Sequence, residues 1–152
     1  MTQVAAKSGR SIAVSFPEAP SQERRSARRH DMEQQDLVVQ RFTGRREGGA
    51  ALGKIVDLSA GGVRIRTTRG AVRPDHQIRV RIELPTYAGI SPFVDTSGER
   101  PQPRNEWVGW MTVTRVATVD EREMEIGGRL VDMDEMDRGM LGLYLSTQPV
   151  AA

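Results

Sequence analysis

The clearest pattern in the chain is an unbroken alternation of apolar and polar side chains over residues 78–84. Arginine and glutamate side chains separate its apolar members, which are Ile78, Val80, Ile82 and Leu84. A period of two is typical of a β-strand with one buried face and one wet face. Pro85 ends the run, as expected for a residue that lacks the backbone N–H.

Shorter runs of the same kind predict the other strands. They cover residues 37–42, 54–58, 63–66, 107–116 and 124–133. A polar, glycine-containing loop at 43–53 indicates a hairpin, and residues 59–62 indicate a turn. With 78–84, the runs make five or six strands and favour a small, mainly β fold.

After Asp132 the period becomes helical. The apolar face of the expected helix comprises Met136, Met140, Leu141 and Tyr144. Asp134 is the candidate N-cap, and Asp137, three residues later, supplies the acid of a pair like a capping box. Two internal glycines each cost about 1 kcal/mol relative to alanine, so packing must hold this helix.

Three segments lie outside this β-rich pattern. Residues 1–20 have no period that could bury a face, and we expect a disordered tail. Residues 86–106 contain three prolines and two glycines, which predicts an unusually long, mobile loop. The expected organisation is one domain at 21–147 with a short tail at 148–152.

Charge and composition narrow the classes of function. Residues 1–30 carry a net charge of +4 and residues 117–138 one of −5. All but two of the 22 basic residues are arginines, whose planar fork suits phosphate and guanine, although a GC-rich genome would enrich arginine too. The absence of cysteine excludes disulfides and thiolate sites and agrees with a cytoplasmic location. The apolar stretch at 12–16 is too short for membrane insertion.

Two motifs could carry chemistry. The first is an arginine arm, Arg24, Arg25, Arg28 and Arg29, just before the first predicted strand. Clustered arginines repel one another unless an anion lies among them, so the arm could bind a phosphodiester. By itself, it could equally be a solvated basic run or a nucleic-acid tail.

The second motif is the turn between two strands, Asp57-Leu58-Ser59-Ala60-Gly61-Gly62. These are ordinary turn residues, since glycine tolerates positive φ and Asp or Ser can bond nearby amides. A carboxylate there can also accept the paired N–H donors on the Watson–Crick edge of guanine.

Together, Arg25-x-x-x-Arg29 and Asp57-x-Ser59-x-x-Gly62 resemble the two-part signature of the PilZ domain family. The flanking residues 23–25 and 63–65, the proline-terminated strand and residues 128–134 before the helix fit the same order. The resemblance extends over residues 21–146. A second register, Arg24 with Arg28, is also open, and His30 and Asp31 depart from the apolar strand entry usual in the family. Asp31 adds negative charge beside the arm.

The resemblance implies a six-stranded antiparallel β-barrel with a C-terminal helix that binds cyclic di-GMP on its outer face. Arg25 and Arg29, helped by Arg24, would bind phosphates and guanine, and Asp57 and Ser59 would bind the guanine edge. Gly61 and Gly62 would let the ligand approach, with Arg28 and Arg64 as secondary ligand residues. The arm would then move on ligand binding and signal to an effector protein in motility, exopolysaccharide or biofilm control.

Other interpretations stand beside this one. A PilZ-like adaptor could bind only protein, and a third class would use the arm on RNA or DNA, although aromatic stacking platforms are scarce. Gly48–Lys54 matches part of a P-loop, but Ile55 replaces the residue that would hold magnesium. We expect no metal, no cofactor and no enzymatic activity, since neither a triad nor a ligand spacing stands out.

Overall fold

The computed structural model describes residues 28–42 and 49–151. In chain order the elements are β1 (His30–Asp31), the 3-10 helix η1 (Glu33–Gln35), β2 (Val38–Phe42), β3 (Ala50–Leu58), β4 (Gly62–Thr68), β5 (Gln77–Glu83), β6 (Phe93–Asp95), β7 (Gln102–Arg104), β8 (Glu106–Thr118), β9 (Glu123–Val131) and α3 (Glu135–Leu145). The predicted tail at 1–20, the domain start at 21–27 and the tip of the first hairpin lie outside the described residues.

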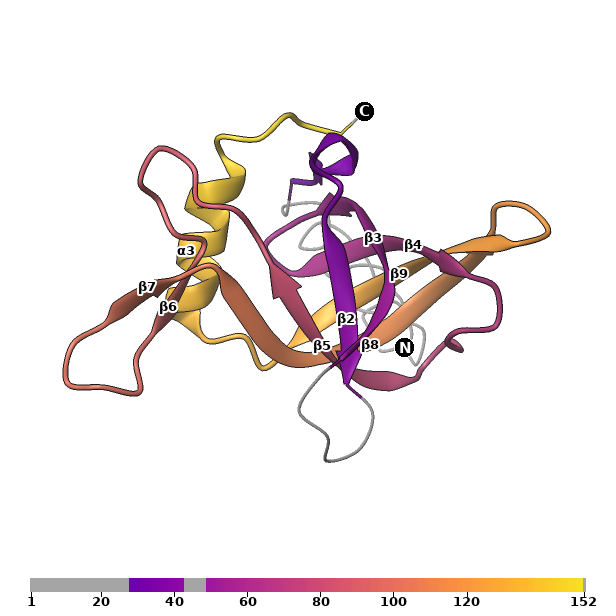
Figure 1. Ribbon diagram of the computed structural model, residues 1–152, viewed down its shortest axis with the longest axis horizontal. Coiled ribbons are helices and arrows are strands. Elements are labelled where there is room, and N and C mark those ends of the chain that lie inside the picture. Colours follow the sequence, from indigo (N-terminus) through magenta and orange to yellow (C-terminus); the bar gives the residue numbers. More distant parts are fainter. Residues whose placement is uncertain (1–27, 43–48, 152) are drawn as a thin grey trace, which may run out of the picture.

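Six of these strands close into an antiparallel barrel in the order β3-β2-β5-β8-β9-β4, with β4 pairing back onto β3 (Figure 1). Short β1 pairs with the end of β3, in line with β2. Helix α3 lies beside the barrel, next to the small β6–β7 sheet. The predicted mainly β class, the six-stranded barrel and the C-terminal helix are all confirmed.

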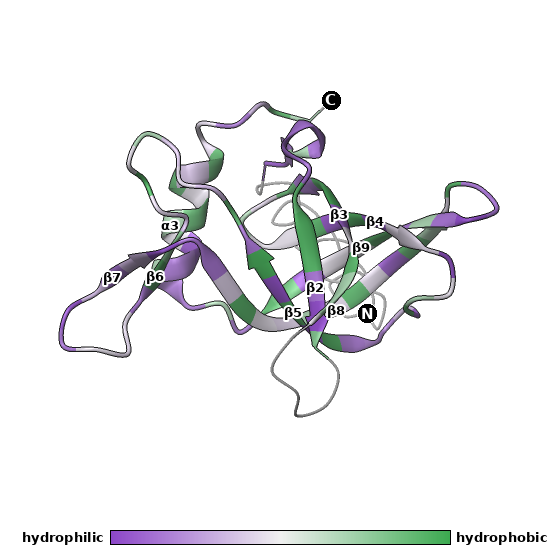
Figure 2. Cartoon of the chain, in the orientation of Figure 1, coloured by the Kyte–Doolittle hydropathy of each residue, from purple (hydrophilic) through white to green (hydrophobic). Residues whose placement is uncertain are grey.

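The barrel interior is filled by the inward positions of each strand, as the alternation predicts. Its fully buried members include Val39, Ile65, Val80, Met111, Val113 and Ile126. Figure 2 shows apolar and polar residues alternating along the barrel strands. Because one face of every strand is buried, the pairing register cannot slip by one residue without exposing this core.

Helix α3 begins as predicted but presents a different face. The Asp134 side chain caps it by accepting from the backbone N–H of Asp137 at 2.7 Å. The predicted apolar face is only partly right, because Met136 is 47% exposed while Leu145 is buried with Leu141 and Tyr144.

Asp137 does not play the part of a capping-box acid. Its carboxylate is buried, accepts from the backbone N–H of Val94 at 2.9 Å and forms an ion pair with Arg104 at 2.7 Å. It therefore joins α3 to the β6–β7 hairpin, a long-range contact that the local sequence pattern did not indicate.

The segment at 86–106 is not a featureless loop. It contains the β6–β7 hairpin, with Phe93 fully buried, and its last residue, Glu106, starts β8. The predicted mobility of this segment stays a prediction. The two short strands escaped notice because neither has the length or the alternation of a barrel strand.

Two boundaries also differ from the predicted ones. Strand β3 starts at Ala50, so the predicted loop at 43–53 ends four residues earlier than expected. The predicted tail at 148–152 is attached, since Val150 bridges to His30 and the Asp31 amide donates to the Pro149 carbonyl at 2.9 Å. Within the described residues, no helix has the length and apolarity needed to cross a membrane.

Candidate functional site

A β-bulge in β3 determines where the carboxylate of the turn motif points. Ile55 pairs with Ile65, but the next pair is Asp57 with Arg64, which leaves Val56 as an extra residue in β3. Without this bulge Val56 would face Arg64 and Asp57 would face the buried Val63. The bulge therefore turns Asp57 to the outer face of the barrel while Ile55 and Leu58 remain in the core.

Two arginines meet this carboxylate. Arg64 Nη2 lies 2.6 Å from one oxygen of Asp57, and Arg29 Nη1 lies 3.7 Å from the other. The Asp57 side chain is only 4% exposed, whereas the Arg29 side chain is 64% exposed. The predicted site residues Arg29 and Asp57 are therefore brought together, and Arg64 is the closer of the two cations.

A chain of ion pairs continues from Arg64 across the strands. Glu125 on β9 forms an ion pair with Arg64 at 3.1 Å and accepts a hydrogen bond from Arg66 at 3.2 Å. Arg66 also lies 3.8 Å from Glu33 of η1. Arg64 and Arg66 are thus each shared between two carboxylates from neighbouring elements, so the protein itself holds these two guanidinium groups in place.

Ser59 holds the turn together. Its hydroxyl accepts from the backbone N–H of Gly62 at 3.1 Å, and the Ser59 N–H donates to the Gly62 carbonyl at 2.8 Å. The turn is also tied to β9, because the Gly61 carbonyl accepts from Leu130 N at 3.0 Å. The buried Ser59 side chain shapes the turn, and the predicted contact of Ser59 with a ligand stays a prediction.

The two glycines of the turn differ in their surroundings. A methyl group added at Gly62 would lie 3.0 Å from the Gly128 carbonyl, so this glycine lets β4 and β9 approach closely. One added at Gly61 would meet only Arg138 Nη1 of α3, at 3.8 Å. The surface over Gly61 is therefore open, with a further guanidinium at its edge.

The backbone of Arg29 is fixed from both sides. On one side, β1, which follows Arg29 directly, pairs His30 with Leu58 and Asp31 with Asp57 at the end of β3. On the other side, Ala151 N donates to the Arg29 carbonyl at 3.0 Å. The chain's last described residues therefore lie beside Arg29.

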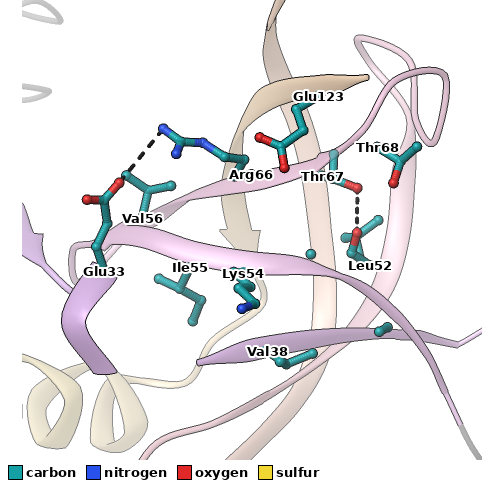
Figure 3. A pocket seen from close by; sticks show the side chains of 12 residues that line it. Glu33, Val38, Leu52, Lys54, Ile55, Val56, Arg66, Thr67, Thr68 and Glu123 are labelled. Atoms are coloured by element: carbon teal, nitrogen blue, oxygen red, sulfur yellow. Dashed lines mark hydrogen bonds and ion pairs between the residues drawn. The ribbon is translucent and has the colours of Figure 1, made fainter. Parts of the chain in front are cut away.

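One hollow borders the Asp57 carboxylate, and a larger one lies next to it. The smaller, of about 200 Å³, is lined by Asp31, Glu33, Val56, Asp57, Arg64 and Ala151. The larger, of about 600 Å³, runs along β3 and β4 and shares Glu33 and Val56 with it. Figure 3 shows the larger hollow, with Arg66 reaching toward Glu33 at one end and Lys54 near Ile55. Asp31 and Glu33 add negative charge to the smaller hollow, in keeping with the position of Asp31 beside the arm.

Some of the predicted site residues are brought together by the structure, and others lie outside the described residues. The described members at this corner of the barrel are Arg29, Asp57, Ser59, Gly61, Gly62 and Arg64. Arg28 is exposed next to Arg29, while Arg24 and Arg25 lie outside the described residues. Sequence reasoning missed Arg66, Glu125 and Arg138, and only the outward positions of the first two on alternating strands could have indicated them.

Two alternatives raised by the sequence can be compared with this geometry. Residues 50–54 of the partial P-loop match lie within strand β3, which continues to Leu58, so the helix N-terminus that a P-loop needs is missing there. Among the described residues, no cluster of three or more His, Cys, Asp or Glu side chains could hold a metal ion.

The fold is similar to that of two solved proteins. Bacillus subtilis inhibitor of motility (MotI/DgrA) matches 79% of this chain with a TM-score of 0.55 and 16% identity. The PilZ domain, with c-di-GMP, of YcgR from Escherichia coli matches 79% of this chain with a TM-score of 0.51 and 10% identity. The match covers 48% of the MotI/DgrA chain and 88% of the YcgR domain, so this chain corresponds to about half of MotI/DgrA.

At these identities the likeness shows the fold, and the chain has a PilZ-like β-barrel fold. No protein-family model matches the chain. No curated protein sequence matches it either. The resemblance to the PilZ family found in the sequence is confirmed at the level of the fold.

Proposed function

We propose that this protein is a receptor for cyclic di-GMP that passes the signal to an effector protein. The observation that carries the proposal is the meeting of Arg29, Asp57 and Arg64 at one open corner of the barrel, with ion-pair distances of 3.7 and 2.6 Å to Asp57. The two solved proteins with this fold support it, since one is described with c-di-GMP and the other as an inhibitor of motility.

The chemistry of the corner suits a guanine nucleotide. Asp57 has two acceptor oxygens that match the two neighbouring N–H donors of a guanine edge, and Arg29 can reach phosphate oxygens or the O6 and N7 atoms. The exposed arm residues Arg28 and Arg29 supply positive charge for a phosphodiester. The open surface at Gly61 leaves room for the ligand.

Ligand binding would work as an exchange of partners at Asp57. The close Arg64 contact must loosen for a guanine edge to reach the carboxylate, and the released guanidinium can then bind a phosphate. We expect the arm at 24–29 to close over the ligand, and the changed surface to be read by the effector. The protein would act as a cytoplasmic adaptor without enzymatic activity, in control of motility, exopolysaccharide or biofilm.

A second candidate function is a PilZ-like adaptor that binds protein and no nucleotide. Two observations favour it: Asp57 already has Arg64 at 2.6 Å, and the Ser59 hydroxyl is bonded within its own turn. A site satisfied in this way gains less from a ligand than an empty one, because each new bond replaces an existing bond.

Titration calorimetry with cyclic di-GMP separates the two. We expect binding to the wild type that weakens by at least about tenfold in Asp57→Ala, Arg29→Ala and Arg25→Ala, since each removes a charge-assisted contact. Arg122→Ala, an exposed arginine on the β8–β9 turn, is the matched control and should bind like the wild type.

The controls decide between specific and general attraction. Equal heats for linear GMP or for mixed-sequence RNA would reject the receptor in favour of a nucleic-acid or general anion site. Absence of heat with every nucleotide would support the protein-only adaptor.

A further inference from the structure

The outer face of β2, β5 and β8 carries a row of side chains unlike any on the Asp57 side. The register places Phe42 of β2 opposite Arg79 of β5, Arg79 opposite Trp110 of β8, and Trp110 opposite Val131 of β9. Side chains that oppose one another on the same face of a sheet lie within contact range. The pairing therefore assembles one continuous outward row.

This row holds an exposed tryptophan. Trp110 is 45% exposed and Val108, two residues earlier on the same face, is 38% exposed, although the chain's other tryptophan, Trp107, is buried. The guanidinium carbon of Arg79 lies 6.0 Å from the centre of the Phe42 ring. Tryptophan and arginine surrounded by apolar area are the residues that most often dominate protein interfaces.

Two arginines lie beside Trp110 on this face. Arg79 opposes Trp110, and Arg129 lies diagonally from it, opposite Thr112. Among the described residues no carboxylate lies within ion-pair distance of either. A positive charge left unpaired next to apolar surface favours a partner that brings carboxylates.

The same face is hollowed at its edge. A depression of about 480 Å³ lies beside β2 and β5, and its lining includes Val38, Gln40, Arg81, Glu83, Leu84 and Pro85. Gln40 and Arg81 belong to the row next to Trp110, because Arg81 opposes Val108. The face thus combines an exposed aromatic side chain with a neighbouring hollow. A docked peptide segment could contact both.

From these observations we infer that the outer face of β2, β5 and β8, centred on Trp110, is the docking surface for a partner protein segment that carries carboxylates beside apolar side chains. The apolar side chains would cover Trp110 and Val108, and the carboxylates would pair with Arg79 and Arg129. In the closed barrel β5 and β8 lie opposite β4 and β3, so the part of this surface around Trp110 and Arg79 lies away from the Asp57 corner. Arg129, which pairs with Gly62, borders both.

Nucleic acid fits this surface less well than an acidic protein. Single-stranded nucleic acid binds to several stacked aromatics along a continuous positive groove. Here Trp110 is the single half-exposed tryptophan, and the carboxylates Glu83, Glu106 and Asp36 border the face or its hollow. They would repel the evenly spaced phosphates of a nucleic acid, whereas a protein segment can place its carboxylates only beside Arg79 and Arg129.

The test uses the full-length protein without nucleotide. Random peptides displayed on phage are selected on the immobilised wild type, and fluorescence anisotropy then measures the affinity of the enriched peptides for purified variants. We expect the enriched peptides to combine Asp or Glu with aromatic or aliphatic residues. They should bind Trp110→Ala and Arg79→Glu at least about tenfold more weakly than the wild type.

Two matched control variants test whether the loss of any exposed apolar or arginine side chain weakens peptide binding. Val119→Ala removes an apolar side chain with the same 45% exposure as Trp110, at the far end of the β8–β9 hairpin, and Arg122→Ala removes an exposed arginine there. Both should bind the peptides like the wild type. Arg79→Glu keeps the proposal testable if Trp110→Ala unfolds, and thermal melts followed by circular dichroism identify a folding defect.

Three results would overturn the inference. The first is enrichment of peptides without acidic residues, or of peptides that bind Trp110→Ala and Arg79→Glu as tightly as the wild type. The second is a wild-type dimer that becomes a monomer in Trp110→Ala by analytical ultracentrifugation, because a second copy would then cover the face. The third is single-stranded RNA that binds the wild type and loses binding in the same two variants.

Discussion

Arg64 and Arg66 on one side of the barrel differ in their partners from Arg79 on the other side. On the side formed by β3, β4 and β9, Arg64 and Arg66 lie between carboxylates of neighbouring elements. On the side formed by β2, β5 and β8, Arg79 faces Phe42 and Trp110 and has no carboxylate in ion-pair range among the described residues. Apolar and polar residues alternate along the strands on both sides. The residue opposite each arginine on the neighbouring strand therefore decides whether its charge is paired within the protein or available to a binding partner.

The largest expected loss of stability comes from a substitution that forces β3 and β4 apart. A methyl group at Gly53 would overlap the Arg66 carbonyl and lie 2.8 Å from the Ile65 side chain. We expect Gly53→Ala to lower the free energy of unfolding by about 2–3 kcal/mol, because backbone must shift to admit it. Urea denaturation followed by tryptophan fluorescence measures the change.

The matched control for Gly53→Ala is Gly127→Ala on β9. There the nearest atom to the added methyl group is Arg115 Cβ at 3.5 Å, an ordinary contact. Its stability should stay within about 0.5 kcal/mol of the wild type. Equal stability of the two variants would show that the close approach of β3 and β4 carries no cost.

The second prediction compares one substitution on both sides. Arg64→Ala removes the nearest cation of the buried Asp57 and leaves only Arg29 at 3.7 Å, so we expect a loss of about 1–3 kcal/mol of unfolding free energy. Arg79→Ala removes an exposed contact with Phe42, for which about 0.5 kcal/mol is expected. Chemical denaturation of the two variants in one buffer tests this, and a larger loss for Arg79→Ala would reverse the comparison.

The smallest expected effect is a change in affinity for cyclic di-GMP, and it rests on the proposed function. Glu125 holds both Arg64 and Arg66, so Glu125→Gln should free these guanidinium groups and reduce repulsion of phosphate. We expect affinity to rise by up to about 1 kcal/mol, roughly fivefold, in calorimetric titration. Glu106→Gln, which removes the partner of Arg81 on the other side, should leave affinity unchanged. Weaker binding in Glu125→Gln would mean that the ion-pair chain supports the ligand site.

Much of the barrel could be predicted because its signals are local. The alternation at 78–84 predicted β5, Pro85 predicted its end, and Asp134 was found as the cap of α3. The Asp57–Gly62 turn was placed between its two strands for the same reason. In each case the cause lies within a few residues of the effect.

The parts that were missed depend on contacts between distant residues. The face of α3 was misjudged because Asp137 is buried against Arg104 of the β6–β7 hairpin, more than 30 positions away in sequence. The pairing of Arg64 with Asp57 could not be deduced, because it requires the extra residue at Val56. The attachment of Ala151 to Arg29 joins opposite ends of the domain and leaves no local pattern.

The bulge at Val56 means that β3 is one residue longer than its pairing with β4 requires. Deleting Val56 would leave Ile55 inside, Asp57 outside and Leu58 inside, because these three residues would then alternate evenly. The deletion would, however, remove the Val56 carbonyl, which accepts from the backbone N–H of Met32 at 3.0 Å. The extra residue therefore stabilises the segment just before η1. Its carbonyl is the hydrogen-bond acceptor for the Met32 N–H.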